Sequence, residues 1–452
     1  MSHWIENSIF YHIYPLGFCG APQQNDFISP PVNRLEKIET WLDHIQGLGV
    51  NAIYLGPLFE STRHGYDTAD YYHVDRRLGD RAALRRLSDA MHRRGMRLVL
   101  DGVFNHVGRD FWAFRDVRER GQASPYQDWF KGIGFNGHSP FGDPFTYESW
   151  AGHYSLVRLN QGNPAVREHL FEAVRMWVEE LGIDGLRLDV ADSLEPDFRR
   201  ALAAFCKGLR SDFWLMGEVI HGDYREWANP EMLDSVTNYE VYKSLYSSHV
   251  DRNFFELAYA LNRQSGADGL YRDRLLYTFA DNHDVDRVAE KLSDPAHLYP
   301  LYLLLLTIPG VPSIYYGSEW GIGGKRTESS DEALRPCLAL PQMLQNSPHP
   351  DLPDTIARLA KLRHSVPALR IGAYHQLDVR SEQIAFLRSS EQGSAVVAVN
   401  IANIPAQFDL PLPPGAPTHY TDALEPGSRF SAEGGRLRFS VPACWGRVLL
   451  PE

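Results

Sequence analysis

Short apolar runs recur along the chain from Ile9 to Tyr316, and several of the stretches between them place apolar residues at helical spacing. Such runs are typical of strands buried on both faces, and strands that alternate with helices pair in parallel. Eight strands are predicted, at residues 9–15, 52–55, 97–103, 183–189, 213–218, 235–238, 276–280 and 311–317. They predict a closed (β/α)8 barrel, an α/β fold that gathers functional side chains at the C-terminal ends of its strands.

The pattern changes in two places. Residues 107–163 are irregular and rich in glycine, proline and aromatic residues, and they are too many for an ordinary loop between a strand and a helix. After a predicted helix at 352–364, short alternating runs separated by turn residues indicate an antiparallel β domain. The predicted organisation is barrel at 1–106, inserted subdomain at 107–163, barrel again at 164–370, and β domain at 371–452.

Composition and charge narrow the class of protein. Of the 452 residues, 44% are hydrophobic and 23% charged, as in ordinary globular proteins. A net charge of −12 without a long basic run argues against a nucleic-acid partner. The aromatic content of 12% fits either core packing or stacking on sugar rings, and composition does not separate the two.

The sequence also predicts where the protein works. Residues 298–316 are apolar enough to suggest a membrane span, but Pro300, Pro309 and Pro312 interrupt them, so a buried helix followed by a buried strand is expected and no membrane contact. The first residues lack a secretory signal. The four cysteines lack metal or redox spacing, and they are Cys19, Cys206, Cys337 and Cys444. We therefore expect reduced thiols and a cytoplasmic location. Nothing in the sequence indicates an oligomeric state.

Two neighbouring strands end in carboxylates with different surroundings. Arg187 lies two residues before Asp189, hence on the same side of its strand, and should lower the pKa of that carboxyl, as suits a nucleophile. An ion pair at a strand end is the simpler alternative. Glu218 follows its strand with no adjacent cation in sequence, so burial should raise its pKa and let it donate a proton. One anionic and one protonated carboxyl group are typical of a retaining glycosidase.

Three further polar residues end predicted strands: His106, His283 and Asp284. A barrel would bring them together with Asp189 and Glu218 around one pocket. The carboxylates could instead bind a metal ion. The histidines, however, are not spaced as a metal-binding pair on one helix.

Four segments, in this order, resemble the signature regions of the α-amylase superfamily, glycoside hydrolase family 13: Asp101–His106, Gly185–Asp189, Gly217–Glu218 and Phe279–Asp284. The resemblance extends from about Ile9 to Leu362. It implies that the insertion is the family's B subdomain and that the C-terminal domain is its antiparallel β-sandwich. It also implies that Asp189 is the nucleophile, Glu218 the general acid and base, and Asp284 the stabiliser of the transition state.

The resemblance implies substrate-binding roles as well. Arg187 would orient Asp189, and His106 and His283 would bind hydroxyl groups of the sugar that is cleaved. Tyr66 would stack under that sugar. Asp331 and Arg335 resemble a pair that holds the next sugar on the non-reducing side, although a surface ion pair is an equal alternative. Asp101 is expected to brace the barrel rather than take part in the chemistry.

The stretch Phe59–Tyr72 looks most like cyclomaltodextrinases, neopullulanases and maltogenic amylases. One departure follows Glu218, where Ile220 stands in a segment in which that group often has tryptophan. Asn105 resembles a calcium ligand of many α-amylases, but the further ligands are not recognisable. We therefore predict no required metal and no other cofactor.

The expected function is retaining hydrolysis of α-1,4-glucosidic bonds in malto-oligosaccharides, cyclodextrins or starch. A transglycosidase, or a member of the family that acts on α-1,6 bonds, is the first alternative. A non-catalytic binding protein or transporter subunit is the second, and it would require missing carboxylates or a membrane segment.

Overall fold

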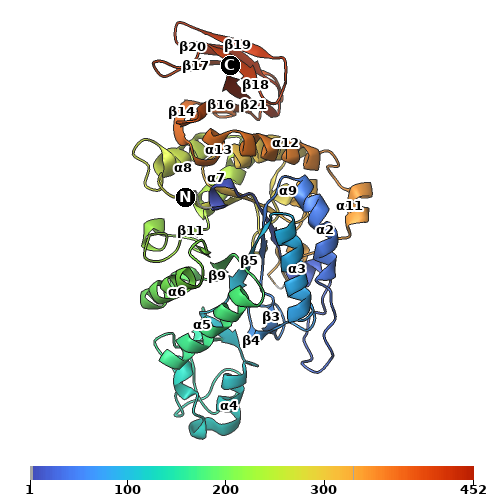
Figure 1. The fold of residues 1–452 in the computed structure, drawn as a ribbon, viewed down its shortest axis with the longest axis vertical. Coiled ribbons are helices and arrows are strands. Elements are labelled where there is room, and N and C mark those ends of the chain that lie inside the picture. Colours follow the sequence, from blue (N-terminus) through green and yellow to red (C-terminus); the bar gives the residue numbers. More distant parts are fainter. Residues whose placement is uncertain (1–3, 329) are drawn as a thin grey trace.

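The computed structural model describes residues 4–328 and 330–452. Its centre is an eight-stranded parallel barrel (Figure 1). The strands are β1 Phe10–Ile13, β2 Ala52–Leu55, β5 Arg97–Gly102, β9 Gly185–Leu188, β10 Trp214–Gly217, β11 Ser235–Val236, β12 Tyr277–Phe279 and β13 Val311–Tyr315. The order β11-β10-β9-β5-β2-β1-β13-β12 is closed by a parallel bridge between Thr237 and Tyr277. The predicted fold class is confirmed.

Helices cover the outside of the barrel. The longer ones are α2 Glu36–Gly47, α3 Arg81–Arg93, α5 Pro164–Glu179, α6 Pro196–Leu209, α7 Tyr239–Val250, α8 Phe255–Ser265, α10 Leu298–Thr307 and α12 Leu352–Ser365. The short ones are α1 Pro15–Phe18, α9 Val288–Lys291, α11 Leu340–Asn346 and α13 Pro367–Ile371. Asp80 caps α3 by accepting a hydrogen bond from the Ala83 amide at 2.7 Å. The apolar run at 298–316 forms α10 and β13, as predicted, and none of the described helices is long and apolar enough to span a membrane.

The segment between β5 and α5 forms a small lobe at the opposite end of the molecule from the C-terminal sheet (Figure 1). It contains α4 Trp112–Arg120 and an antiparallel sheet of β6 His106–Gly108, β8 His153–Arg158 and β7 Ser149–Trp150. The hairpin of β3 Phe59–Ser61 and β4 Thr68–Val74 follows β2. Because β6 begins at His106, that residue connects the barrel to the lobe.

The C-terminal domain is an antiparallel sheet with the order β14-β15-β16-β21-β18-β19-β20-β17. Its strands are β14 Ala373–Val379, β15 Gln383–Ser390, β16 Gly393–Asn400, β17 Ala406–Pro411, β18 His419–Asp422, β19 Arg429–Glu433, β20 Arg436–Val441 and β21 Trp445–Pro451. Alternate residues of β15 enter two cores: Ile384 and Phe386 join the barrel core, whereas Ala385 and Leu387 pack inside the β domain. Burial on both faces explains the continuous apolar sequence of this strand.

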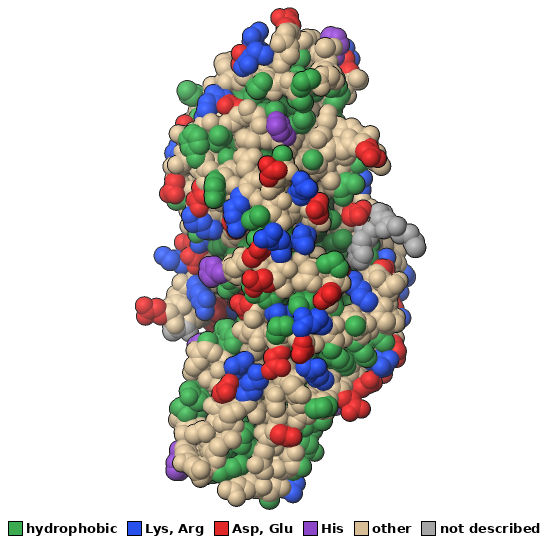
Figure 2. Space-filling view, turned by 90° about the vertical axis from the view of Figure 1, so that its left-hand side faces the viewer, with side chains coloured by type: hydrophobic (Ala, Val, Ile, Leu, Met, Phe, Trp, Pro, Cys, Tyr) green, Lys and Arg blue, Asp and Glu red, His purple; other side chains and the backbone are tan. Residues whose placement is uncertain are grey.

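Charged side chains of both signs are interspersed over the face of the molecule drawn in Figure 2. This distribution agrees with the absence of a long basic run in the sequence. It gives that face no single-sign field that would attract a polyanion.

Candidate active site

One buried guanidinium connects three carboxylates at the C-terminal ends of neighbouring strands. Arg187 Nη1 lies 2.9 Å from Asp101 Oδ1 and 3.0 Å from Asp189 Oδ1, and its Nη2 lies 2.9 Å from Glu218 Oε2. The Arg187 side chain is only 3% exposed, so water screens these contacts little. Glu218 has no adjacent cation in sequence, but the neighbouring strand supplies one in space. β9 pairs with β10, with Leu188 opposite Gly217, and this pairing brings together residues that are distant in sequence.

Burial dominates the ionisation of the two central carboxyl groups. It raises the pKa of Asp189 well above its usual range, although Arg187 opposes the increase. Burial also raises the pKa of Glu218, again against Arg187. The predicted lowering of the Asp189 pKa is thus wrong, because desolvation outweighs the ion pair. Since both groups share one cation, they lose their protons as a coupled pair in two steps.

Val190 holds Glu218 from the other side. It adopts the left-handed backbone conformation, with φ 40° and ψ 52°, which is strained for a β-branched residue. In this conformation its amide donates a hydrogen bond of 3.0 Å to Glu218 Oε2. A left-handed turn is usually marked by glycine, and because this position holds valine, the contact could not be predicted from sequence.

Asp284 has the opposite electrostatic character. Its Oδ2 lies 2.9 Å from His283 Nε2, and its Oδ1 lies 3.0 Å from Arg335 Nη2. Burial opposes ionisation, but His283 and Arg335 together hold the pKa of Asp284 well below its usual range. Arg335 also binds Asp331 Oδ2 at 3.1 Å. The predicted Asp331–Arg335 pair is therefore continuous with Asp284 rather than isolated on the surface.

Two histidines and a tyrosine surround the carboxylates. Tyr66 stacks on His283, with ring centroids 5.6 Å apart and planes 12° apart, and the two side chains share a hydrogen bond. His106 Nε2 lies 3.8 Å from Asp189 Oδ2 and has no hydrogen-bond partner among the described residues. Burial lowers the pKa of His106 to about 3, so its ring is neutral at pH 7 and can bind a hydroxyl group.

Asp101 braces this arrangement, as expected. In addition to Arg187, it accepts hydrogen bonds from Tyr54 Oη at 2.8 Å and Tyr66 Oη at 3.1 Å. It is fully paired and does not line the cleft, so it acts on the site through Arg187 and Tyr66.

A cleft of about 1190 Å³ opens over these groups. The predicted site residues that line it are Tyr66, His106, Asp189, Glu218, Asp284, Asp331 and Arg335. Arg187 and His283 lie behind them. Trp150, Tyr239 and Ile220 also line the cleft and were not predicted as substrate-binding residues. Only the aromatic side chains of Trp150 and Tyr239 could have pointed to sugar binding.

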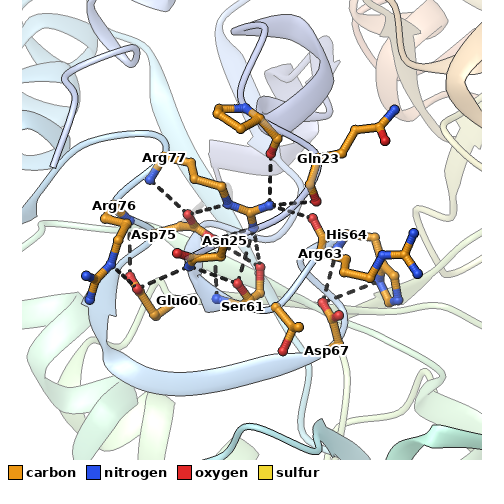
Figure 3. Close-up of polar contacts among 12 residues, drawn as sticks. Gln23, Asn25, Glu60, Ser61, Arg63, His64, Asp67, Asp75, Arg76 and Arg77 are labelled. Carbon is orange, nitrogen blue, oxygen red and sulfur yellow. Dashed lines mark hydrogen bonds and ion pairs between the residues drawn. The ribbon is translucent and has the colours of Figure 1, made fainter. Parts of the chain in front are cut away.

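A second polar network fixes one wall of the cleft (Figure 3). Arg77 pairs with Asp75 Oδ2 at 2.7 Å. Its Nη1 donates hydrogen bonds to the backbone carbonyls of Pro22 and Gln23, both at 3.1 Å, and of Arg63 at 2.8 Å. Pro22, Gln23 and Arg63 line the cleft, so this buried arginine joins two wall-forming loops. Sequence reasoning missed Arg77, because its partners are mostly backbone carbonyls.

Comparison with known proteins places the chain in a family. Residues 12–348 match the model of the alpha amylase catalytic domain. The chain belongs to the alpha-amylase family. It is therefore a glycoside hydrolase, as predicted, and the resemblance to the group of cyclomaltodextrinases, neopullulanases and maltogenic amylases is confirmed.

Three relatives illustrate the similarity. A cyclomaltodextrinase from a Bacillus species is 32% identical over 416 residues, which cover 88% of this chain and 73% of the relative. An intracellular maltogenic amylase of Bacillus subtilis (strain 168) is 28% identical over 430 residues, which cover 90% of this chain and 70% of the relative. The cyclic α-maltosyl-(1→6)-maltose hydrolase of Arthrobacter globiformis, in its ligand-free structure, is 27% identical with a TM-score of 0.83, and 99% of both chains is covered.

Proposed function

We propose that this alpha-amylase family member hydrolyses α-1,4-glucosidic bonds of malto-oligosaccharides, cyclodextrins or starch, with retention of configuration. The relatives named cyclomaltodextrinase and maltogenic amylase support the substrate class. The observation that supports this mechanism is the Arg187 guanidinium. It contacts both Asp189 and Glu218 and so holds the two carboxyl groups close together. A short separation is what a retaining pair requires, because the nucleophile must reach the anomeric carbon without an intervening water.

In this mechanism, the pair enters the reaction with one proton. Asp189 attacks the anomeric carbon and forms a glycosyl ester, while Glu218 protonates the departing glycosidic oxygen. Glu218, now ionised, then removes a proton from water, and that water attacks the same carbon and releases Asp189. The Val190 amide stabilises the ionised form of Glu218 between the two steps.

The remaining predicted residues bind and orient the substrate. Asp284 stays ionised beside the oxocarbenium-like transition state and binds ring hydroxyl groups. His106 binds hydroxyl groups and Tyr66 supports the sugar ring. His283 lies behind the cleft, so in place of the predicted contact with a hydroxyl group it orients Tyr66 and Asp284. Asp331 and Arg335 hold the next sugar on the non-reducing side.

The reaction requires no metal ion in this proposal. The Asn105 side-chain amide lies 3.2 Å from His106 Nδ1. Among the described residues, the group of His, Cys, Asp and Glu ligands close enough to share an ion lies elsewhere, at Asp294, His297 and Cys444. The contact of Asn105 with a histidine ring supports the proposal that Asn105 is not part of a calcium site. Activity lost in EDTA and restored by calcium would contradict this.

We also infer a cytoplasmic location, which the intracellular relative from Bacillus subtilis supports. Substrates would then be oligosaccharides already taken into the cell. Activity recovered from the culture medium rather than from the cell extract would overturn this inference.

Parallel incubation with maltoheptaose, β-cyclodextrin, pullulan and soluble starch, followed by chromatography of the products, tests the proposed substrate class. We expect cleavage of maltoheptaose and β-cyclodextrin at α-1,4 bonds. The relative from Arthrobacter, whose name specifies a substrate with (1→6) linkages, supports an α-1,6-active member as the second candidate. Pullulan cut only at α-1,6 bonds would favour that candidate. Products longer than the substrate would favour a transglycosidase.

A further inference from the structure

A cluster of three potential metal ligands lies where the barrel meets the C-terminal domain. Asp294 and His297 precede α10 in the barrel, and Cys444 lies between β20 and β21 of the β domain. One ligand atom from each side chain lies within 4.8 Å of the other two. None of the three residues lines the catalytic cleft.

The hydrogen bonding of His297 leaves one of its ring nitrogens available to bind a cation. His297 is 1% exposed, and its Nε2 lies 3.0 Å from the carbonyl oxygen of Ile401. That hydrogen bond places the ring proton on Nε2 and leaves the lone pair on Nδ1. Nδ1 has no hydrogen-bond partner among the described residues. A buried ring nitrogen without a partner is costly, and a metal ion would satisfy it.

The other two side chains each contact a neighbouring polar group, which is a backbone amide for Asp294 and a side-chain amide oxygen for Cys444. Asp294 uses Oδ1 to accept a hydrogen bond from the Ala296 amide at 3.0 Å. Among the described residues, its other carboxylate oxygen accepts no hydrogen bond and is available to bind an ion. Cys444 adopts a left-handed backbone conformation, with φ 45°, that directs its thiol toward the loop after β16, where Sγ lies 3.4 Å from Asn403 Oδ1.

From this arrangement we propose that Asp294, His297 and Cys444 form a zinc site that joins the barrel to the C-terminal domain. Thiolate, imidazole and carboxylate are the ligands that zinc takes, and three of them leave a fourth tetrahedral position for water. Binding displaces the proton of the Cys444 thiol into solvent, so that the thiolate coordinates the ion. The site is structural and separate from the sugar chemistry.

The full-length protein, freed of metal by a chelator, can be titrated with Zn²⁺ and with Co²⁺ as a spectroscopic probe. We expect one ion per chain, a thiolate-to-cobalt charge-transfer band, and a rise in the thermal unfolding midpoint with Zn²⁺. Cys444→Ser should lose the charge-transfer band and weaken zinc binding by about 100-fold or more, since even residues that only support ligands change affinity by up to that factor. Asp294→Asn keeps a good helix cap and should also weaken binding.

Cys337→Ser is the matched control, because it removes an exposed cysteine far in sequence from the site. It should retain the band, the stoichiometry and the stabilisation. Cys444→Ser should hydrolyse maltoheptaose at the wild-type rate at moderate temperature. The proposal is overturned if the wild type binds no zinc, if Cys444→Ser binds zinc as tightly as the wild type, or if Cys337→Ser loses the band instead.

Discussion

Replacing Arg187 by lysine tests the electrostatic centre of the site. The guanidinium makes contacts of 2.9–3.1 Å with Asp101, Asp189 and Glu218 through two nitrogens. Lysine keeps the positive charge but presents it as a single point, so it cannot hold all three carboxylates at once. At least one carboxylate loses its cation in Arg187→Lys.

The expected loss of activity follows from the hydrogen bonds that Arg187→Lys removes. A hydrogen bond to a charged group contributes about 1.5–3 kcal/mol, so losing two of them removes roughly 3–6 kcal/mol from the fixed geometry of the pair. Even the lower value, if it acts on the transition state, reduces kcat/KM by about 100-fold. Because Arg187 opposes the increase in both carboxyl pKa values, a weaker cation raises these pKa values further. Attack requires ionised Asp189, so the acidic limb of the pH–rate profile should move to higher pH, and the basic limb, set by protonated Glu218, should follow.

The assay is kcat/KM for maltotriose across the pH range, together with thermal unfolding. Arg85→Lys is the matched control, since Arg85 forms an exposed ion pair with Asp89 that contributes only about 0–1 kcal/mol. Its activity and profile should match the wild type. An Arg187→Lys enzyme with both limbs unmoved, or with kcat/KM within about tenfold of the wild type, would refute the reasoning.

Three further predictions concern other parts of the site. Asp189→Asn should abolish turnover but keep the unfolding midpoint and maltose binding, and substantial remaining activity would exclude Asp189 as nucleophile. Val190→Gly should relieve the backbone strain and stabilise the fold by about 1 kcal/mol or more while kcat falls, as Glu218 becomes less fixed; a destabilised variant in thermal unfolding would contradict the strain. Arg77→Gln should raise KM for maltoheptaose more than it lowers kcat for maltotriose, because it loosens one wall of the cleft; an equal loss of kcat for both substrates would indicate general damage instead.

The barrel could be predicted from sequence because its strands are continuous apolar runs and its helices have regular spacing. Residues 384–387 of β15 are also continuously apolar, because both faces of this strand are buried. Charged residues at strand ends then identified the carboxylates, because a barrel places all such ends on one face. These inferences depend on local pattern and fold topology alone.

The features of the site that could not be predicted from sequence depend on contacts between neighbouring strands and loops. The cation beside Glu218 comes from the neighbouring strand, and the net effect on Asp189 depends on burial, which a local motif does not reveal. Val190 shows no glycine signal for its left-handed turn. Arg77 acts mainly on backbone carbonyls, which no side-chain motif marks.

The central claim, hydrolysis through a covalent intermediate on Asp189, is tested most directly by the configuration of the first product. Proton NMR of maltotriose or β-cyclodextrin hydrolysis, recorded before the sugars mutarotate, distinguishes the two anomers at the new reducing end. Two displacements at the same carbon restore its configuration, so the account predicts the α-anomer. Initial release of the β-anomer would mean a single displacement by water and would contradict the mechanism.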